Sequence, residues 1–504
     1  MSSIIMKDIR KSYDCKPVLS GVSVSLSEGK RVALVGENGS GKTTLLRIMA
    51  RKIEVDSGEL ISPKNACVYI AQDFSGDDQE TPYDFLRRRV SKIHEAIRLL
   101  DETGFSLGKN DGRLYGVNCG NLSGGERKKL EIVAGLSSGA NFVALDEPEN
   151  HLDYQTIEWL IGTLLRFRGG LIFVSHDQYL IDQLADTILE LAGGIVTAYS
   201  MKYEAYLAEK ERQVAGRARR WGYEEKTIKR LRKTVEMMKL RAQQASDTAR
   251  TYQQTKRRLK EMRERHGEKP TVDYNKPSVK LADAEQKKGK LIALVDHVNF
   301  AYETTQIFYD ASVELRFGEK VVLFGPNGVG KSTLVRLLTG ELIPQSGTSR
   351  IGVAIRTQFM TQDHLAGIDH TKPVLEVFET TLGWPEGRCR SYLAKYGIGS
   401  ELVSQPVQII SGGQQARFKL ALIFAQEPEF LILDEPTNHV DPPTWEAIVE
   451  SIQGYSGTVL AITHDRLFID AIAEKLWVIN KHKIRVELGN LSDYLEREKR
   501  TKTN

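Results

Sequence analysis

Two glycine-rich loops in this chain have the residue types needed to hold the phosphates of a nucleotide. The first runs from Gly36 to Thr43 (GENGSGKT) and the second from Gly325 to Ser332 (GPNGVGKS). An apolar, strand-forming run precedes each loop and a helix-forming segment follows it, which is the context that makes this pattern specific. The backbone N–H groups of such a loop surround the phosphates, its lysine reaches the β- and γ-phosphates, and its last hydroxyl binds Mg²⁺. The sequence therefore predicts two sites for ATP and Mg²⁺.

The predicted phosphate-binding residues are Gly36, Asn38, Gly39, Ser40, Gly41, Lys42, Thr43 and Thr44 in the first loop, and Gly325, Asn327, Gly328, Val329, Gly330, Lys331, Ser332 and Thr333 in the second. An aromatic residue, Tyr13 or Tyr302, stands 23 residues before the first glycine of each loop. The repeated spacing predicts that each ring stacks on adenine, although a lone aromatic at such a position would more often be a packing residue.

Carboxylates suited to ATP hydrolysis follow apolar runs in both halves of the chain. In Asp146-Glu147 and Asp434-Glu435 the aspartate can hold the Mg²⁺ shell and the glutamate can orient the attacking water. Phosphoryl transfer needs this kind of positioning and charge stabilisation more than covalent help. A glutamine follows each loop lysine by 30 or 31 residues and a histidine follows each glutamate by 29. The predicted catalytic residues are Gln72, Glu147, His176, Gln362, Glu435 and His464, and the predicted Mg²⁺ ligands are Thr43, Gln72, Asp146, Ser332, Gln362 and Asp434.

The same set of motifs occurs twice, in the same order and almost in register. The second copy lies 289 residues after the first at the loop lysine, and 288 residues after it at the Ser-Gly-Gly motif, the Asp-Glu pair and the histidine. A register kept over such a length indicates a duplicated domain. Apolar runs alternate with helix-forming stretches in each copy, which predicts an α/β fold with a mainly parallel sheet. We call residues 1–206 the first repeat and residues 291–504 the second repeat.

Residues 207–290, which we call the linker, differ sharply in composition from the repeats. They contain 13 Lys and 12 Arg against 12 acidic residues, a net charge of 13 positive, whereas the whole chain has a net charge of +4. The linker is rich in strong helix formers, so we expect a helix from about Ala205, a tip near residues 237–245 and a returning helix to about His266. A basic hairpin of this kind favours contact with RNA, and a solvated pair of charged helices is the alternative.

Composition excludes several other classes of protein. The chain has 504 residues, 41% of them apolar and 27% charged, which is typical of a globular protein with an ample core. No apolar run approaches the roughly 18–20 residues that cross a membrane, and the N-terminus does not read as a signal peptide. The cysteines, Cys15, Cys67, Cys119 and Cys389, are scattered. Their spacing excludes a zinc ribbon or an iron–sulfur cluster and suits a reducing cytoplasm.

The motifs together resemble the ATP-binding cassette superfamily. Ser123-Gly124-Gly125-Glu126 and Ser411-Gly412-Gly413-Gln414 look like its signature, and residues 434–441 (DEPTNHVD) resemble the soluble ABC-F family in particular. The resemblance implies two P-loop domains in tandem, joined by a long α-helical hairpin, that close head to tail as an intramolecular sandwich in a monomer. ATP would then lie between the loop of one repeat and the signature of the other, held also by Ser123, Gly124, Gly125 and Glu126 or by Ser411, Gly412, Gly413 and Gln414.

The resemblance also implies a partner. ABC-F proteins bind the 70S ribosome near the tRNA exit site and direct the linker toward the P-site tRNA, the rRNA and the peptidyl-transferase centre. Because neither a first-repeat insertion nor a C-terminal extension is visible, the chain looks more like the ribosome-protecting, antibiotic-resistance members than the housekeeping translation factors. Two other readings stay open, the motor of a membrane transporter and a DNA-associated ATPase, although no membrane subunit is expected.

Three departures from the family pattern fall near the predicted sites. Glu149 stands where the second repeat has Thr437, Lys129 stands where it has Arg417, and Ile410 replaces the usual leucine before the signature. A second carboxylate beside Glu147 adds negative charge near the first site and would raise carboxylate pKa values there. We therefore expect the two sites to differ in activity.

Overall fold

The computed structural model describes residues 2–14, 16–37, 39–63, 66–103, 105, 113–150, 152–241, 246–265, 287, 289–303, 305–361, 367–437, 440 and 442–503. Clustering of contacts divides the chain into two compact units, one of residues 1–202 and 274–504 and the other of residues 203–273. The first unit contains both repeats except residues 203–206, and the second contains those four residues and the helices of the linker.

The first repeat combines a mainly parallel sheet with a smaller antiparallel one. Its strands are β1 (Ser3–Tyr13), β2 (Lys16–Ser27), β3 (Arg31–Val35), β4 (Ser57–Ile61), β5 (Cys67–Ile70), β6 (Phe142–Asp146), β7 (Gly170–Val174), β8 (Thr187–Ala192) and β9 (Ile195–Tyr199). Its helices are α1 (Lys42–Met49), α2 (Pro82–Arg89), α3 (Ile93–Asp101), α4 (Arg113–Gly116), the short 3₁₀ turn η1 (Cys119–Asn121), α5 (Gly124–Leu136), α6 (Tyr154–Arg166) and α7 (Gln178–Leu184).

The second repeat has the same plan. Its strands are β10 (Leu291–Tyr302), β11 (Thr305–Arg316), β12 (Lys320–Phe324), β13 (Ser346–Ile351), β14 (Thr357–Met360), β15 (Phe430–Asp434), β16 (Thr458–Ile462), β17 (Lys475–Asn480) and β18 (Lys483–Leu488). Its helices are α10 (Lys331–Leu338), α11 (Val374–Leu382), α12 (Glu386–Lys395), α13 (Gly412–Ala425), α14 (Pro442–Gln453), α15 (Arg466–Ile472) and α16 (Leu491–Thr503).

The order of the strands explains how the predicted site residues come together. Within the described residues, the main sheets run β5-β6-β7-β3-β8-β9 and β14-β15-β16-β12-β17-β18, parallel except for the last pair of each. The segments after β3, β5, β6 and β7 carry the glycine-rich loop, the glutamine, the Asp-Glu pair and the histidine of the first repeat. Because parallel strands end at the same edge of a sheet, these four segments meet there. The predicted α/β fold is therefore confirmed, and the antiparallel sheets β2-β1-β4 and β11-β10-β13 were not predicted.

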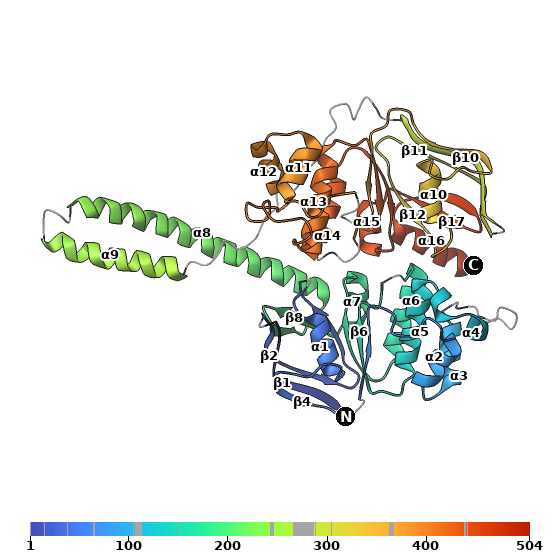
Figure 1. The fold of residues 1–504 in the computed structure, drawn as a ribbon, viewed down its shortest axis with the longest axis horizontal. Helices are drawn as coiled ribbons and strands as arrows, with labels where there is room; N and C mark the ends of the chain where they lie inside the picture. The colour runs from blue at the N-terminus through green and yellow to red at the C-terminus, as the bar shows by residue number, and fades with distance from the viewer. Residues whose placement is uncertain are drawn as a thin grey trace. The chain divides into compact units, whose positions relative to one another are not determined.

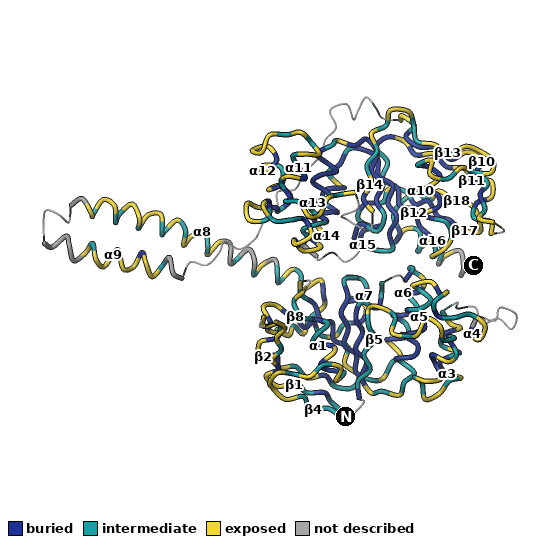
Figure 2. Tube along the Cα trace, in the orientation of Figure 1, coloured by how far each residue is buried: buried dark blue, intermediate teal, exposed yellow. Residues whose placement is uncertain are grey.

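Burial follows the hydrophobic pattern of each strand. Strands β6, β7 and β16 are buried along their whole length, and the helices on each side of the sheets bury one face (Figure 2). Residues 82–101 form α2 and α3 with a break at residues 90–92. Helices α1 and α10 each begin at the loop lysine, after a glycine with a left-handed backbone.

The linker forms two long helices, α8 (Tyr203–Arg241) and α9 (Ser246–Arg265), that pack side by side (Figure 1). The helix-forming composition predicted both, and residues 242–245 at the expected tip and 266–286 after α9 lie outside the described residues. Within the described residues, no helix combines the length and the apolar character that a membrane span requires.

Candidate functional site

The first glycine-rich loop is built between β3 and α1. Gly36, Gly39 and Gly41 have positive φ angles of 156°, 80° and 103°, and a Cβ added to Gly41 would lie 2.6 Å from Val18 Cγ1. The Lys42 ammonium donates to the carbonyl oxygens of Gly36 at 2.7 Å and Glu37 at 3.0 Å. The loop therefore holds its lysine at the position from which it would reach bound phosphates.

The second loop repeats this geometry between β12 and α10. Gly325, Gly328 and Gly330 have φ angles of 157°, 78° and 106°. The Lys331 ammonium donates to the carbonyl oxygens of Gly325 at 2.8 Å and Pro326 at 2.9 Å. Burial lowers the pKa of Lys331, opposed by nearby carboxylates of which Glu435 acts most strongly. Both loops hold the lysine ammonium against main-chain carbonyl oxygens. A positive charge held in place in this way is suited to bind an anionic ligand.

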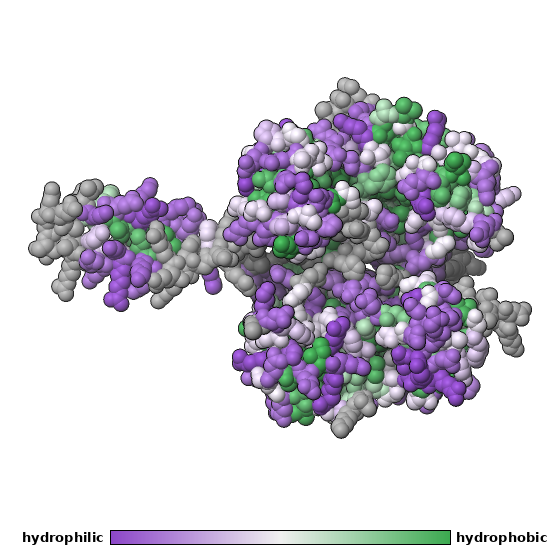
Figure 3. Space-filling model, viewed as in Figure 1, coloured by the Kyte–Doolittle hydropathy of each residue, from purple (hydrophilic) through white to green (hydrophobic). Residues whose placement is uncertain are grey.

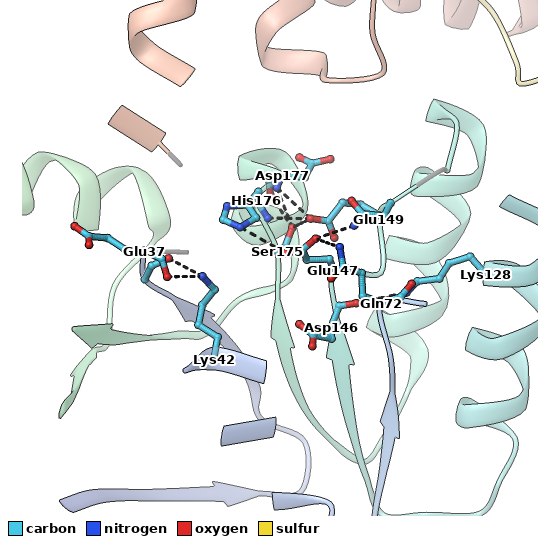
Figure 4. Close-up of polar contacts among 12 residues, drawn as sticks. Glu37, Lys42, Gln72, Lys128, Asp146, Glu147, Glu149, Ser175, His176 and Asp177 are labelled. Atoms are coloured by element: carbon cyan, nitrogen blue, oxygen red, sulfur yellow. Dashed lines mark hydrogen bonds and ion pairs between the residues drawn. The ribbon is translucent and has the colours of Figure 1, made fainter. Parts of the chain in front are cut away.

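Glu147 is the centre of a polar cluster at the edge of the first sheet (Figure 4). Its Oε2 accepts from Gln72 Nε2 at 3.0 Å and from Asn150 Nδ2 at 2.7 Å. His176 Nε2 lies 3.7 Å from Glu147 Oε1. The structure thus brings together Gln72, Glu147 and His176, which were predicted from their spacing alone. Asn150 was not predicted, although its repeated position within the Asp-Glu motif could have suggested it.

Both candidate catalytic glutamates have strained backbones. Glu147 has a φ of 45° and Glu435 a φ of 48°, a left-handed conformation that non-glycine residues adopt infrequently. Their N–H groups donate to Val174 O at 2.9 Å and Ile462 O at 2.8 Å, on the neighbouring strands. Strain of this kind persists where the surrounding structure fixes it, and it is common at functional sites.

In the second repeat, Glu435 is buried to nearly the same extent as Glu147, with side chains 17% and 15% exposed. Burial, with a smaller contribution from the like charge of Asp434, raises the pKa of Glu435 from its ordinary 4.5 to about 7, while Lys331 opposes the shift. Burial also lowers the pKa of His464 to about 4, so that this ring is neutral at pH 7. His464 Nε2 lies 3.0 Å from Asn327 Oδ1 in the glycine-rich loop. A carboxylate that titrates near pH 7 is suited to accept a proton from water.

The two predicted metal aspartates have different neighbours. Tyr69 donates to Asp146 Oδ2 at 2.9 Å, and Arg47 Nε donates to the same hydroxyl at 3.4 Å. Strand register places Phe359 in β14 at the position of Tyr69 in β5. A phenylalanine has no hydroxyl to donate, so Asp434 cannot receive the equivalent hydrogen bond. The sequence did not reveal this difference, because Tyr69 lies 77 residues from its partner.

The signature motifs form the starts of α5 and α13. Ser123 caps α5 through the Glu126 N–H, and the Glu126 carboxylate accepts from Ser123 N at 2.9 Å. Ser411 and Gln414 form the same reciprocal cap at α13. Glu126 and Gln414 thus hold the helix start in place, and their contact with a nucleotide remains a prediction. The first two residues of each helix are the glycines Gly124 and Gly125, or Gly412 and Gly413.

The remaining predicted residues are placed as follows. Tyr13 and Tyr302 are 43% and 41% exposed, and their stacking on adenine remains a prediction. Thr43 and Ser332 lie in the first turn of α1 and α10, next to the loop lysines. A hydroxyl and a carboxylate are the oxygen donors that a Mg²⁺ ion takes when phosphates and water supply the rest, so the residues present fit Mg²⁺ with ATP. Asn38 and Gln362 lie outside the described residues.

Glu149 binds the segment that begins after β7. Its Oε1 accepts from Ser175 Oγ at 2.6 Å and from His176 N at 2.9 Å, and burial raises its pKa. The equivalent residue of the second repeat, Thr437, donates its hydroxyl to Asp465. The carboxylate expected as extra charge at the first site thus fixes the main chain at His176, and the like charge of Glu147 adds to the rise in its pKa.

The two repeats contact each other next to the second loop. Asn327 N donates to Asp153 Oδ2 at 3.2 Å, so the residue that caps α6 of the first repeat reaches the loop of the second. Arg466 of the second repeat lies 3.4 Å from Glu158 Oε1 and 4.4 Å from the Tyr179 ring centroid. These contacts place residues of the first repeat at the edge of the second candidate site.

Comparison with known proteins agrees with the geometry of both sites. The family model described as "ABC transporter" matches residues 19–150 and 308–438, which include both loops and both Asp-Glu pairs. The chain is 30% identical to ABC transporter F family member 5 of Arabidopsis thaliana, over 98% of this chain and 76% of that protein. It is 29% identical to the energy-dependent translational throttle protein EttA of Mycobacterium tuberculosis, over 92% of this chain and 89% of EttA.

Two further similarities complete the comparison. The ribosome protection protein VmlR of Bacillus subtilis is 28% identical, over 97% of this chain and 89% of VmlR. Among solved structures, an RNase-L inhibitor has a TM-score of 0.64 at 19% identity, covering 97% of this chain and 92% of that one, which shows a shared fold. With two matched nucleotide-binding repeats and relatives that align over nearly its whole length, the chain belongs to the ABC-F family of ATP-binding cassette ATPases.

Proposed function

We propose that this protein is a cytoplasmic ATPase that binds the 70S ribosome near the tRNA exit site, directs its linker toward the P-site tRNA and the peptidyl-transferase centre, and protects the ribosome from antibiotics. The observation that carries ribosome binding is the basic, separately folded hairpin between two ATPase repeats. The names of two aligned relatives support it, since one is a translational throttle and the other a ribosome protection protein.

ATP binding would drive closure of the two repeats, and hydrolysis would release it. In the proposed monomeric sandwich, Lys42 and Glu147 face Ser411 of the second signature, and Lys331 and Glu435 face Ser123 of the first. Mg²⁺ held by the aspartate and the loop hydroxyl would supply charge neutralisation at the phosphates. The contact between Asp153 and the second loop supports this pairing, because it brings the first repeat to that loop.

The surface of α8 and α9 is suited to RNA. Arg219, Arg220, Arg230 and Arg258 are exposed, and the described part of the hairpin is mainly hydrophilic in Figure 3. Several other cations, such as Arg257, pair with a glutamate one turn away. Cations on a slender helical pair can contact phosphates independently of base sequence, which makes binding strongly dependent on salt.

Ribosome pelleting at several salt concentrations tests this proposal. Replacing Arg219, Arg220 and Arg230 by Gln removes three exposed cations from α8. If each contacts one phosphate, the slope of log K against log salt should fall by about 2–3, at roughly 0.7–0.9 per contact. The control replaces Lys16, Lys30 and Lys52, three exposed cations of the first repeat, with the same amide. If both variants lose ribosome affinity equally, net charge alone explains the effect. That result would contradict a specific role for the linker.

The housekeeping role of a translation factor is the second candidate, favoured by the similarity to EttA. The two roles are distinguished by translation in vitro with a lincosamide, a pleuromutilin or a streptogramin A. Rescue by the wild-type protein supports ribosome protection. A protein that pellets with ribosomes but rescues translation from none of these drugs is a housekeeping factor instead.

A further inference from the structure

A buried lysine links the signature helix of the first repeat to two segments of its ATP site. Lys128, on α5, is 3% exposed. Its Nζ donates to Ala71 O at 2.7 Å and Gln72 O at 3.2 Å, and lies 3.4 Å from Asp146 O. The first two oxygens follow β5 and the third ends β6, so one ammonium joins three elements behind the cluster of Figure 4. No local sequence pattern indicates this role of Lys128, because its partners lie 57, 56 and 18 residues away.

The lysine lies among buried carboxylates of the same repeat. Glu131, one turn further along α5, accepts from Ser75 N at 2.6 Å and is 5% exposed. Glu131, Glu149 and Asp146 all act electrostatically on Lys128, against the burial that lowers its pKa. Lys128 is therefore the internal counter-charge of an acidic region around the first site.

The second repeat has different residue types at all three of these positions. At the offset of 288 residues, Lys128 corresponds to Ala416, Glu131 to Lys419 and Glu149 to Thr437. Ala416 is fully buried in α13, which packs on β14 as α5 packs on β5. The fold is thus built in the second repeat without an ammonium at this position, and burying such a charge is costly. A costly group that the fold does not require points to a role in function.

We propose that Lys128 is a positioning residue for hydrolysis at the first ATP site. It fixes the main chain of Gln72, whose side chain donates to Glu147 Oε2, and so holds both groups in place for the attack of water on the γ-phosphate. It does not bind the nucleotide. At the second site Ala416 cannot make this contact, because its side chain has no donor. The proposal rests on the assignment of Glu147 and Gln72 to the first site, and not on ribosome binding.

The test is Lys128→Met, which keeps the length of the side chain and removes its charge. Hydrolysis at one site at a time is measured as a single turnover in a Glu435→Gln or a Glu147→Gln background. In the Glu435→Gln background, where the first site acts alone, the rate should fall at least about tenfold, as small misplacements of catalytic groups do. ATP affinity should stay within about twofold, because Lys128 does not contact the nucleotide, and in the Glu147→Gln background the rate should also change less than about twofold.

A matched control and a second variant keep the test decisive. Lys129→Met removes the neighbouring ammonium, which donates to Thr103 O at 3.1 Å instead, and should change neither rate. Should Lys128→Met fold poorly, the combined change Lys128→Ala, Glu131→Lys and Glu149→Thr copies the packing of the second repeat and should show the same loss. Equal rate losses in both backgrounds, or none in either, overturn the proposal. Wild-type turnover in a double Glu147→Gln, Glu435→Gln variant would instead refute the site assignment itself.

Discussion

Glu435 should destabilise the nucleotide-free protein at neutral and alkaline pH, and Glu435→Gln should reveal this. Burial and the like charge of Asp434 raise the pKa of Glu435 from 4.5 to about 7, and its side chain is 17% exposed. A shift of about 2.5 units at 1.36 kcal/mol each corresponds to about 3 kcal/mol. That is the free energy the folded state loses by keeping this carboxylate ionised in the second repeat.

The pH window follows from the two pKa values. Below pH 4.5 the carboxyl is protonated in both the folded and the unfolded chain, so it leaves stability unchanged. Between pH 4.5 and about 7 the unfolded chain ionises first, and stability is lost as pH rises. Above pH 7 the loss is complete. Gln keeps the shape and has no charge, so the Glu435→Gln variant should match wild type at pH 4 and gain steadily up to pH 7.

Differential scanning calorimetry without nucleotide or Mg²⁺ measures the difference. For a domain of about 200 residues, about 3 kcal/mol corresponds to a rise of about 6–12 °C in the Tm of the second repeat at pH 8. Glu341→Gln is the control, since that side chain is 62% exposed in the same repeat. If the Tm profiles of Glu435→Gln and wild type run parallel from pH 4 to 8, the pKa of Glu435 is not raised by burial in the folded protein.

The remaining predictions concern turnover and the linker. Replacing Glu147 and Glu435 together by Gln should nearly abolish steady-state ATP hydrolysis while ATP binding is retained, and the locked protein should inhibit translation in vitro; hydrolysis at the wild-type rate would show that these carboxylates are not the catalytic ones. The two single variants should retain unequal rates, because their surroundings differ, and indistinguishable rates would remove the case for unequal sites. Replacing Met237, Met238 and Leu240 near the linker tip by Ala should leave ATP hydrolysis and ribosome pelleting close to normal and weaken drug rescue; a loss of pelleting would instead place these residues among the binding contacts.

Much of the fold was accessible from the sequence because its signals are local. Apolar runs next to glycine-rich loops predicted β3 and α1, and β12 and α10, since strand and helix propensities act over a few residues. The helices of the linker followed from composition in the same way. Gln72, Glu147 and His176 recur at nearly the same spacing in the second repeat. This repetition suggested that the three residues belong to one site.

Sequence alone thus determined the number of repeats, their α/β class and most of the candidate site residues. Only the tertiary structure decided the left-handed backbone at Glu147, the hydrogen bond from Tyr69 to Asp146 and the carbonyl contacts of Lys128. Glu149 illustrates the limit, since its place in the chain suggested charge beside Glu147 but did not reveal that its side chain binds the main chain at His176. Such contacts depend on which strands become neighbours in the sheet. They also depend on which polar groups become buried and therefore need hydrogen-bond partners. Local sequence determines neither.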